Sequence, residues 1–129
     1  KILQPMVYKN SVELATDGKS LSYFDCVPGL PLQLEAKGEK KLRILTRLQF
    51  SDMMGQEESY RLKVSEGKKV LGTFYFNTER SSSTQILDRL DKVPGKWRSC
   101  EISVPDGKHL YDIEVLDRDK AVLTRFILY

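Results

Sequence analysis

Apolar and polar residues alternate along residues 41–50, KLRILTRLQF, more clearly than anywhere else in the chain. Leu42 and Ile44 share one parity, and Arg43 and Arg47 share the other. Successive side chains of a β-strand point to opposite faces, so a period of two separates these residues onto two faces. The segment is therefore predicted to be a strand with one apolar face turned toward a core.

Segments of the same kind recur along the chain, and turn residues separate them. No stretch with a helical period lies between them, so βαβ units are not expected. In Pro105-Asp106-Gly107, the Asp-Gly pair supplies the positive backbone φ that a tight hairpin needs. The chain is predicted to be all-β: an antiparallel β-sandwich, immunoglobulin-like or jelly-roll, of seven to nine strands. The other predicted strands are 20–26, 31–37, 59–65, 69–77, 97–104, 109–116 and 121–128.

The length of 129 residues fits a single domain over residues 1–129, in which residues 1–18 could form a loosely packed N-terminal segment. Residues 78–96 are polar and are expected to be the main irregular connection, with 85–90 as a short helical segment or a short edge strand. The parity of the strands then predicts the inward-facing residues. These are Leu42, Ile44, Leu48, Leu62, Val64, Phe74, Phe76, Ile102, Val104, Ile113, Val115 and Phe126.

The charges are mixed along the chain and argue against nucleic acid as a partner. Twenty-one basic and 18 acidic residues give a net charge of +3, and no basic stripe is present. No apolar run approaches the ~20 residues of a transmembrane segment. Because the chain begins at Lys1, a cleaved leader is one explanation, and an extracytoplasmic (periplasmic or secreted) location is expected.

The sequence lacks the common motifs of catalysis, metal binding and phosphate binding. No HExxH, CxxC, EF-hand loop, glycine-rich phosphate loop or G-x-S-x-G elbow occurs, and His109 is the only histidine. We therefore expect no catalytic residue, no metal site, no cofactor and no enzymatic activity. His109 shares the parity of Tyr111 and Ile113, so it is interpreted as a partly covered strand-end residue, with ligand contact as the alternative.

The aromatic residues supply the first candidate binding residues. Trp97 shares the parity of Ser99 and Glu101, which are polar, and a flat apolar ring on a polar face suits a sugar or protein ligand. The alternative is that Trp97 covers one end of the core. Tyr75 lies on the face opposite to the neighbouring Phe74 and is a second candidate.

Arg43 and Arg47 lie on the predicted outward face of their strand. Salt bridges with neighbouring carboxylates are one role for them, and a site for an anionic ligand is the other. The candidate ligand-binding residues are therefore Trp97, Tyr75, Arg43, Arg47 and His109.

Cys26 and Cys100 are the only cysteines, and each has the inward parity of its strand. A disulfide between them would join two sheets, as in extracytoplasmic sandwiches. Two free buried thiols that act as small apolar residues are the alternative.

Residues 94–116 resemble the late strands of immunoglobulin-like glycan-binding modules of the glycogen-binding, early-set type, through the Val104–Gly107 turn and Tyr111. The chain as a whole also resembles small β-sandwich domains of bacterial envelope proteins. The resemblance implies a sandwich with a sugar ligand, in which Trp97 is one counterpart of the ligand-stacking tryptophans. A non-catalytic binding or assembly module with a protein or glycan partner is the function we expect. A carbohydrate-binding module in the narrow sense is the alternative, and an enzyme with a loop-built site is the third.

Overall fold

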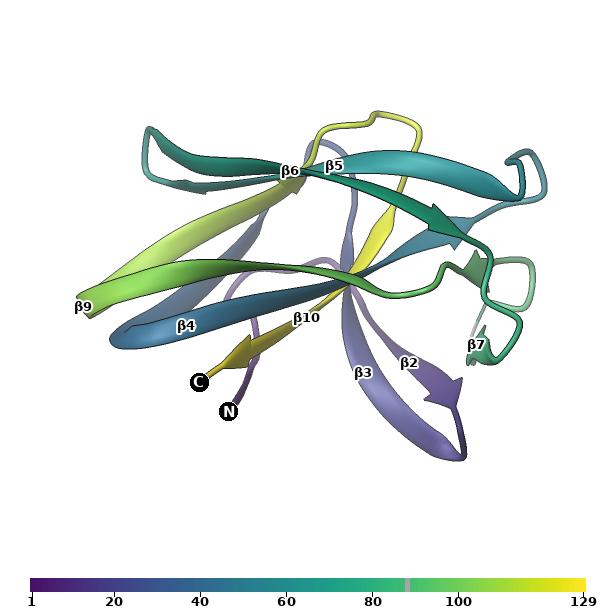
Figure 1. The fold of residues 1–129 in the computed structure, drawn as a ribbon, viewed down its shortest axis with the longest axis horizontal. Helices are drawn as coiled ribbons and strands as arrows, with labels where there is room; N and C mark the ends of the chain where they lie inside the picture. The colour runs from purple at the N-terminus through teal and green to yellow at the C-terminus, as the bar shows by residue number, and fades with distance from the viewer. Residues whose placement is uncertain (88) are drawn as a thin grey trace.

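The computed structural model of the chain describes residues 1–87 and 89–129, and it is an all-β, antiparallel fold (Figure 1), as predicted. Asp88, inside the segment 85–90, lies outside the described residues. No helix that could cross a membrane occurs in the described part of the chain. The strands are β1 (Ile2–Leu3), β2 (Ser11–Thr16), β3 (Lys19–Cys26), β4 (Leu32–Phe50), β5 (Glu57–Glu66), β6 (Lys69–Glu79), β7 (Thr84–Ile86), β8 (Val93–Pro94), β9 (Arg98–Val115) and β10 (Val122–Leu128).

The strands follow the order β6-β5-β9-β4-β10-β3-β2-β7, with β1 beside β10 and β8 beside β4. Strands β4 and β9 are paired from Leu32↔Ile113 to Thr46↔Arg98, so they form one long two-stranded ribbon. One end of the ribbon continues into β5 and β6, and the other end continues into β10, β3, β2 and β7. Because the ribbon bends between its ends, the sheet folds over itself as a β-sandwich (Figure 1).

The bend lies at Gly38, which opposes both Asp106 and Gly107. A Cβ atom at position 38 would lie 1.8 Å from the carbonyl oxygen of Pro105, so the close approach of the two strands requires glycine. Gly107 has a φ of +96°, the positive value expected from the Asp-Gly pair. The prediction of a hairpin turn here is nevertheless wrong, because residues 98–115 continue as one strand and the turn residues form a β-bulge.

The same continuity joins the predicted strands 31–37 and 41–50 into β4. The eight predicted strands thus become six in the structure. The strands β1, β2, β7 and β8 were not predicted as regular strands, and they bring the number of described strands to ten. The hairpin between β5 and β6 forms as predicted, with Gly67 at a φ of +59°.

The fold of the ribbon buries the residues with inward parity between the two layers. All twelve predicted inward residues contribute to this core: nine are buried, while Phe74, Phe76 and Ile102 pack at its margin. Tyr60 and Tyr111 are fully buried additions from the same strands. The core therefore follows directly from the alternation in the sequence.

A second, smaller cluster covers the opposite face of the layer that contains β2, β3 and β10. Strand β2 contributes Val12 and Leu14 to it, so residues 11–16 are part of the packed sheet rather than a loose segment. Ile86 of β7 joins the cluster, and β7 pairs with β2 as a short edge strand, one of the two expectations for residues 85–90.

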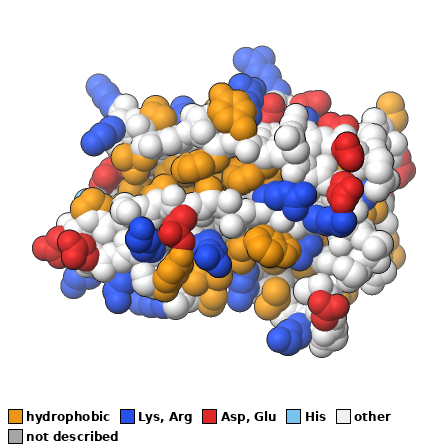
Figure 2. Space-filling view, in the orientation of Figure 1, with side chains coloured by type: hydrophobic (Ala, Val, Ile, Leu, Met, Phe, Trp, Pro, Cys, Tyr) orange, Lys and Arg blue, Asp and Glu red, His pale blue; other side chains and the backbone are white. Residues whose placement is uncertain are grey.

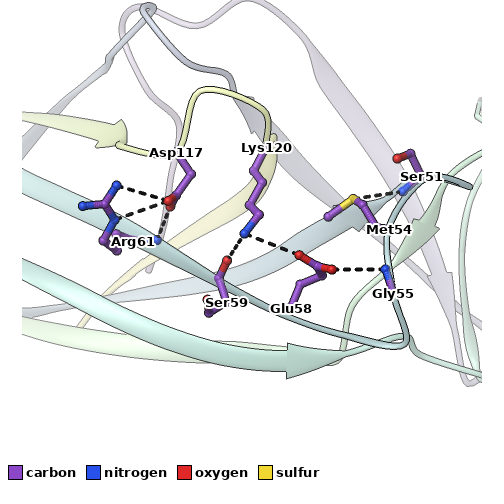
Figure 3. A network of polar contacts seen from close by, with 8 residues as sticks. All are labelled: Ser51, Met54, Gly55, Glu58, Ser59, Arg61, Asp117 and Lys120. Atoms are coloured by element: carbon purple, nitrogen blue, oxygen red, sulfur yellow. Dashed lines mark hydrogen bonds and ion pairs between the residues drawn. The ribbon is translucent and has the colours of Figure 1, made fainter.

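Two ion pairs fasten the β9–β10 turn to β5 (Figure 3). The backbone N–H of Arg61 donates to the carboxylate of Asp117 at 2.8 Å, and the guanidinium donates to the same carboxylate at 3.2 and 3.3 Å. Lys120 pairs with Glu58 at 3.5 Å and donates to the carbonyl of Ser59. Asp117 therefore helps to fix the β9–β10 turn against β5.

Cys26 and Cys100 are both free thiols in the core, so the disulfide is not formed. Cys26 lies opposite Val122 of β10, and Cys100 lies opposite Ile44 of β4. Strands β4 and β10 lie between their two strands, and the positions of β4 in register with the cysteines, Leu48 and Ile44, are four residues apart, so the cysteines are not neighbours in the sheet. A disulfide needs Cα atoms within about 7 Å. Burial raises the pKa of each thiol to about 12.

Candidate functional site

A polar groove of about 610 Å³ opens beside the first residues of β9. Three distant parts of the chain form its walls: the turn after β2, the serine-rich segment before β7, and the segment that enters β9. Arg47 contributes from β4, a fourth part of the chain. The lining residues are Thr16, Asp17, Arg47, Ser81, Ser82, Ser83, Thr84, Lys96, Trp97, Arg98 and Ser99.

Arg47 has the parity predicted for it, but it is buried rather than facing solvent. Only 7% of its surface is exposed. The face of β4 opposite to the main core is covered by residues from the segment 78–96, among them Thr84 and Gly95. The expectation of an open outward face at Arg47 is therefore corrected: a connection that looks irregular in the sequence folds over it.

The guanidinium of Arg47 is held by neutral acceptors. Nη1 donates to the carbonyl of Gly95 at 3.1 Å and to Oγ1 of Thr84 at 3.4 Å, and Nε donates to the hydroxyl of Tyr23 at 3.4 Å. No carboxylate of the described residues lies within ion-pairing distance of it. A buried charge without a counter-charge is costly. The groove thus includes a positive charge whose hydrogen-bond partners among the described residues are all neutral.

Trp97 places an apolar ring at the same groove. Its side chain has no covering layer, and the residue is 55% exposed. Arg98 follows it, and its guanidinium donates to the carbonyls of Trp97 and Asn77 at 2.8 Å each. Lys96 pairs with Glu79 on β6. The expectation that Trp97 lies on a polar, accessible face agrees with this geometry.

Hydroxyl groups make up the opposite wall. Thr84 Oγ1 donates to Thr16 Oγ1 at 3.2 Å, and the backbone N–H of Ser83 donates to Ser81 Oγ at 3.3 Å. Ser82 and Ser83 are exposed. Residues 81–84 belong to the segment that the sequence predicts only as an irregular connection, because no local pattern indicates that they share a groove with Arg47 and Trp97.

The structure does not bring Arg43 and Tyr75 into this groove. Arg43 is 3.9 Å from the carboxylate of Glu101 and lies over the ring of Tyr129, with 5.6 Å from its Cζ to the ring centroid. It therefore has the salt-bridge role that was one of its two predicted roles. Tyr75 is 74% exposed on β6, the edge strand.

His109 lies at the bend of the ribbon, away from the groove. Its Nδ1 is 2.7 Å from the carboxylate of Glu66, and its Nε2 is 3.2 Å from the carbonyl oxygen of Asp106. Its ring is stacked on Tyr111, with centroids 5.9 Å apart. The hydrogen bond to Glu66, followed by that to Asp106, raises the pKa of His109.

The groove is better equipped for holding a ligand than for acid–base chemistry. Asp17 is its single carboxylate, and its lining includes no histidine among the described residues. No group of three or more potential metal ligands occurs in the described parts of the chain. Cations, hydroxyls and one indole ring are instead the groups it presents.

No protein-family model matches the chain, and no curated protein matches it. The solved structures that resemble the fold include the following two. One is dimeric latent PorU from Porphyromonas gingivalis, with a TM-score of 0.41 and 10% identity over 97% of this chain and 13% of that chain. The other is the C-terminal CBM6 of LamC from Zobellia galactanivorans, with a TM-score of 0.36 and 9% identity over 98% of this chain and 97% of that chain. The chain thus spans a small part of the PorU chain and nearly all of the CBM6 chain, which is one module of LamC.

Proposed function

We propose that the protein is a non-catalytic binding module whose groove at the start of β9 holds a carbohydrate. One observation supports this most: the exposed indole of Trp97 shares a groove with a wall of serine and threonine hydroxyls and with Arg47. A sugar ring has apolar C–H faces and a rim of hydroxyls. An aromatic ring complements the faces, while hydroxyl and guanidinium groups complement the rim.

The non-catalytic part of the proposal is supported by the lining of the groove. Hydrolysis of a glycosidic bond commonly uses two carboxyl groups on either side of the bond. Asp17 is the one carboxylate among the described lining residues. An enzyme with a loop-built site is the third alternative, and cleavage of a bound oligosaccharide during a long incubation would indicate it.

The proposal is tested by substituting Trp97 and measuring oligosaccharide binding, first on a glycan array and then by calorimetry. Trp97→Ala should weaken binding by about tenfold or more, because the ligand loses its stacking surface. The melting temperature should change by only a few degrees, because the ring is exposed. Tyr75→Ala is the matched control: it removes an exposed aromatic ring outside the groove and should leave affinity unchanged.

Two results would contradict this role of Trp97. One is unchanged sugar binding by Trp97→Ala. The other is a loss of stability above about 3 kcal/mol, which is typical of a core residue and would make Trp97 part of the packing.

A protein partner is the second candidate, and the edge strand β6 favours it. Among the described residues β6 pairs only with β5, and Val70, Leu71 and Tyr75 are exposed on it. Figure 2 shows hydrophobic side chains gathered in a band between β6 and β9. A free strand edge with apolar side chains can pair with a strand of another protein. Under this alternative the glycan array stays empty, and substitutions on β6 abolish partner binding.

The proposed carbohydrate ligand agrees with the extracytoplasmic location expected from the sequence. Polysaccharides are most accessible to a binding module outside the cytoplasm. Fractionation of the producing cells, followed by detection of the protein, measures the location directly.

A further inference from the structure

We infer that the groove selects an acidic sugar, and that Arg47 binds the carboxylate of a uronic acid residue. This inference rests on the proposed function and names the class of carbohydrate. It starts from the way in which the protein accommodates its most buried guanidinium.

Two partly buried arginines have a carboxylate partner, while Arg80 donates only to backbone carbonyls in the described part of the chain. Arg89 donates to Asp25 at 2.7 Å, and Arg61 donates to Asp117 at 3.2 Å. Arg47 is more buried than either, and among the described residues its partners are two hydroxyls and one carbonyl. Because burying a charge without its counter-ion is unfavourable, an anion that arrives from the groove would best compensate the charge of Arg47.

The geometry of Arg47 suits a carboxylate. Its Nε and Nη1 are already engaged by Tyr23, Thr84 and Gly95, so the guanidinium plane is fixed before a ligand arrives. Its Nη2 makes no hydrogen bond to any described residue. A fixed, planar donor loses little conformational entropy when it binds a planar carboxylate, and a charge-assisted hydrogen bond is stronger than a neutral one.

Arg98 adds a second positive charge to the groove. Arg98 is a second guanidinium whose described acceptors are backbone carbonyls, so it keeps its full charge at the groove. Lys96 is paired with Glu79, and Asp17 is the one opposing carboxylate in the lining. A groove with this balance of charge should bind an anionic sugar more tightly than a neutral one, because the hydroxyls of a neutral sugar can accept hydrogen bonds from the two guanidinium groups but form no ion pair with them.

The test compares oligogalacturonate with its methyl ester on the unmodified protein, by calorimetry at low salt. The two ligands share the same ring and hydroxyls and differ in the charge of the carboxyl group. The acid should bind at least about tenfold more tightly than the ester. The preference should shrink when the salt concentration rises from about 50 mM to about 500 mM, because salt screens the charges.

Arg47→Met then assigns the preference to this side chain. Methionine keeps the unbranched apolar part of the side chain and removes the guanidinium, and the variant should bind the acid and the ester within about threefold of each other. Arg43→Met is the matched control, because it removes an arginine of the same strand that lies outside the groove. It should keep the preference of the unmodified protein.

The outcomes separate the inference from the proposed function. Equal binding of acid and ester by the unmodified protein overturns the inference alone, even if Arg47→Met does not fold. Binding of a sulfated oligosaccharide without binding of oligogalacturonate overturns the assignment to a carboxylate. If the preference survives in a folded Arg47→Met, Arg47 is not its source. Binding of no oligosaccharide at all overturns both proposals.

Discussion

His109 is tied to the bend of the ribbon by two acceptors, one on each ring nitrogen. The carboxylate of Glu66 faces Nδ1 at 2.7 Å, and the carbonyl oxygen of Asp106 faces Nε2 at 3.2 Å. A neutral imidazole has one N–H and can donate to only one of them, whereas the protonated ring donates to both. The folded protein therefore stabilises the protonated form, and the pKa of His109 is raised.

This pKa shift predicts that the contribution of His109 to stability depends on pH. A group whose pKa is higher in the folded state stabilises the fold fully below its unfolded pKa of about 6.5. The contribution is lost as the pH rises through the raised folded value. The difference in unfolding free energy between the unmodified protein and His109→Gln should thus be larger at about pH 5.5 than at about pH 8.5, as measured by urea denaturation.

Glu66→Gln supplies the control for this prediction. Without the carboxylate, the main cause of the raised pKa of His109 is removed, so the pH dependence that distinguishes His109 from glutamine should be reduced. A difference between the unmodified protein and His109→Gln that stays constant across this pH range would contradict the assigned cause.

At the scale of elements, the long β4–β9 ribbon determines the fold, and its bend depends on local backbone chemistry. Gly38 allows the carbonyl of Pro105 to approach where a Cβ would otherwise lie, and Gly107 adopts a positive φ in the bulge opposite. Such positions are characteristic of β-bulges, which bend a strand and increase its twist. The two layers of the sandwich are therefore connected through continuous strands at this corner.

Gly38→Ala should destabilise the protein by about 2–3 kcal/mol, because the added methyl group overlaps backbone atoms that must move. Gly55→Ala is the matched control. Its new Cβ would lie 3.5 Å from the nearest side-chain atom, and Gly55 has no positive φ, so its stability should change little. Urea denaturation of the two variants measures both effects. A stability of Gly38→Ala equal to that of Gly55→Ala would show that the bend does not need glycine.

At the scale of the whole molecule, the layer that contains β2, β3 and β10 has an apolar cluster on each face. The main core lies between the two layers, and the smaller cluster lies on the opposite face. Cys26 and Cys100 lie in the main core, with 0% and 9% of their surfaces exposed. The thiolate is the form that reacts, and a pKa of about 12 leaves very little thiolate at neutral pH. Neither thiol should therefore react readily in the folded protein.

This arrangement predicts the result of a thiol titration without reductant. The folded protein should react slowly with an aromatic disulfide reagent, and unfolding in guanidinium chloride should release both thiols at once if the domain unfolds cooperatively. A count of no thiols in the unfolded, unreduced protein would mean that Cys26 and Cys100 pair in solution, against the arrangement of their strands.

The sequence by itself determined the faces of the strands. Leu42 and Ile44 lie in the core, and Trp97 lies on an accessible face, because the period of two is a local property of an extended chain. It also determined the positive φ of Gly107, since Asp-Gly favours that conformation wherever it occurs.

Only the tertiary structure decided which role each of these local conformations has in the fold. The Asp-Gly backbone can close a hairpin or form a bulge, and the pairing of β9 with Gly38 of β4 made it a bulge. Parity placed Arg47 opposite the core, but the segment 78–96 decided that it is buried and that serine hydroxyls share its groove. Contacts between distant parts of a chain depend on how the whole sheet folds, and no local pattern encodes them.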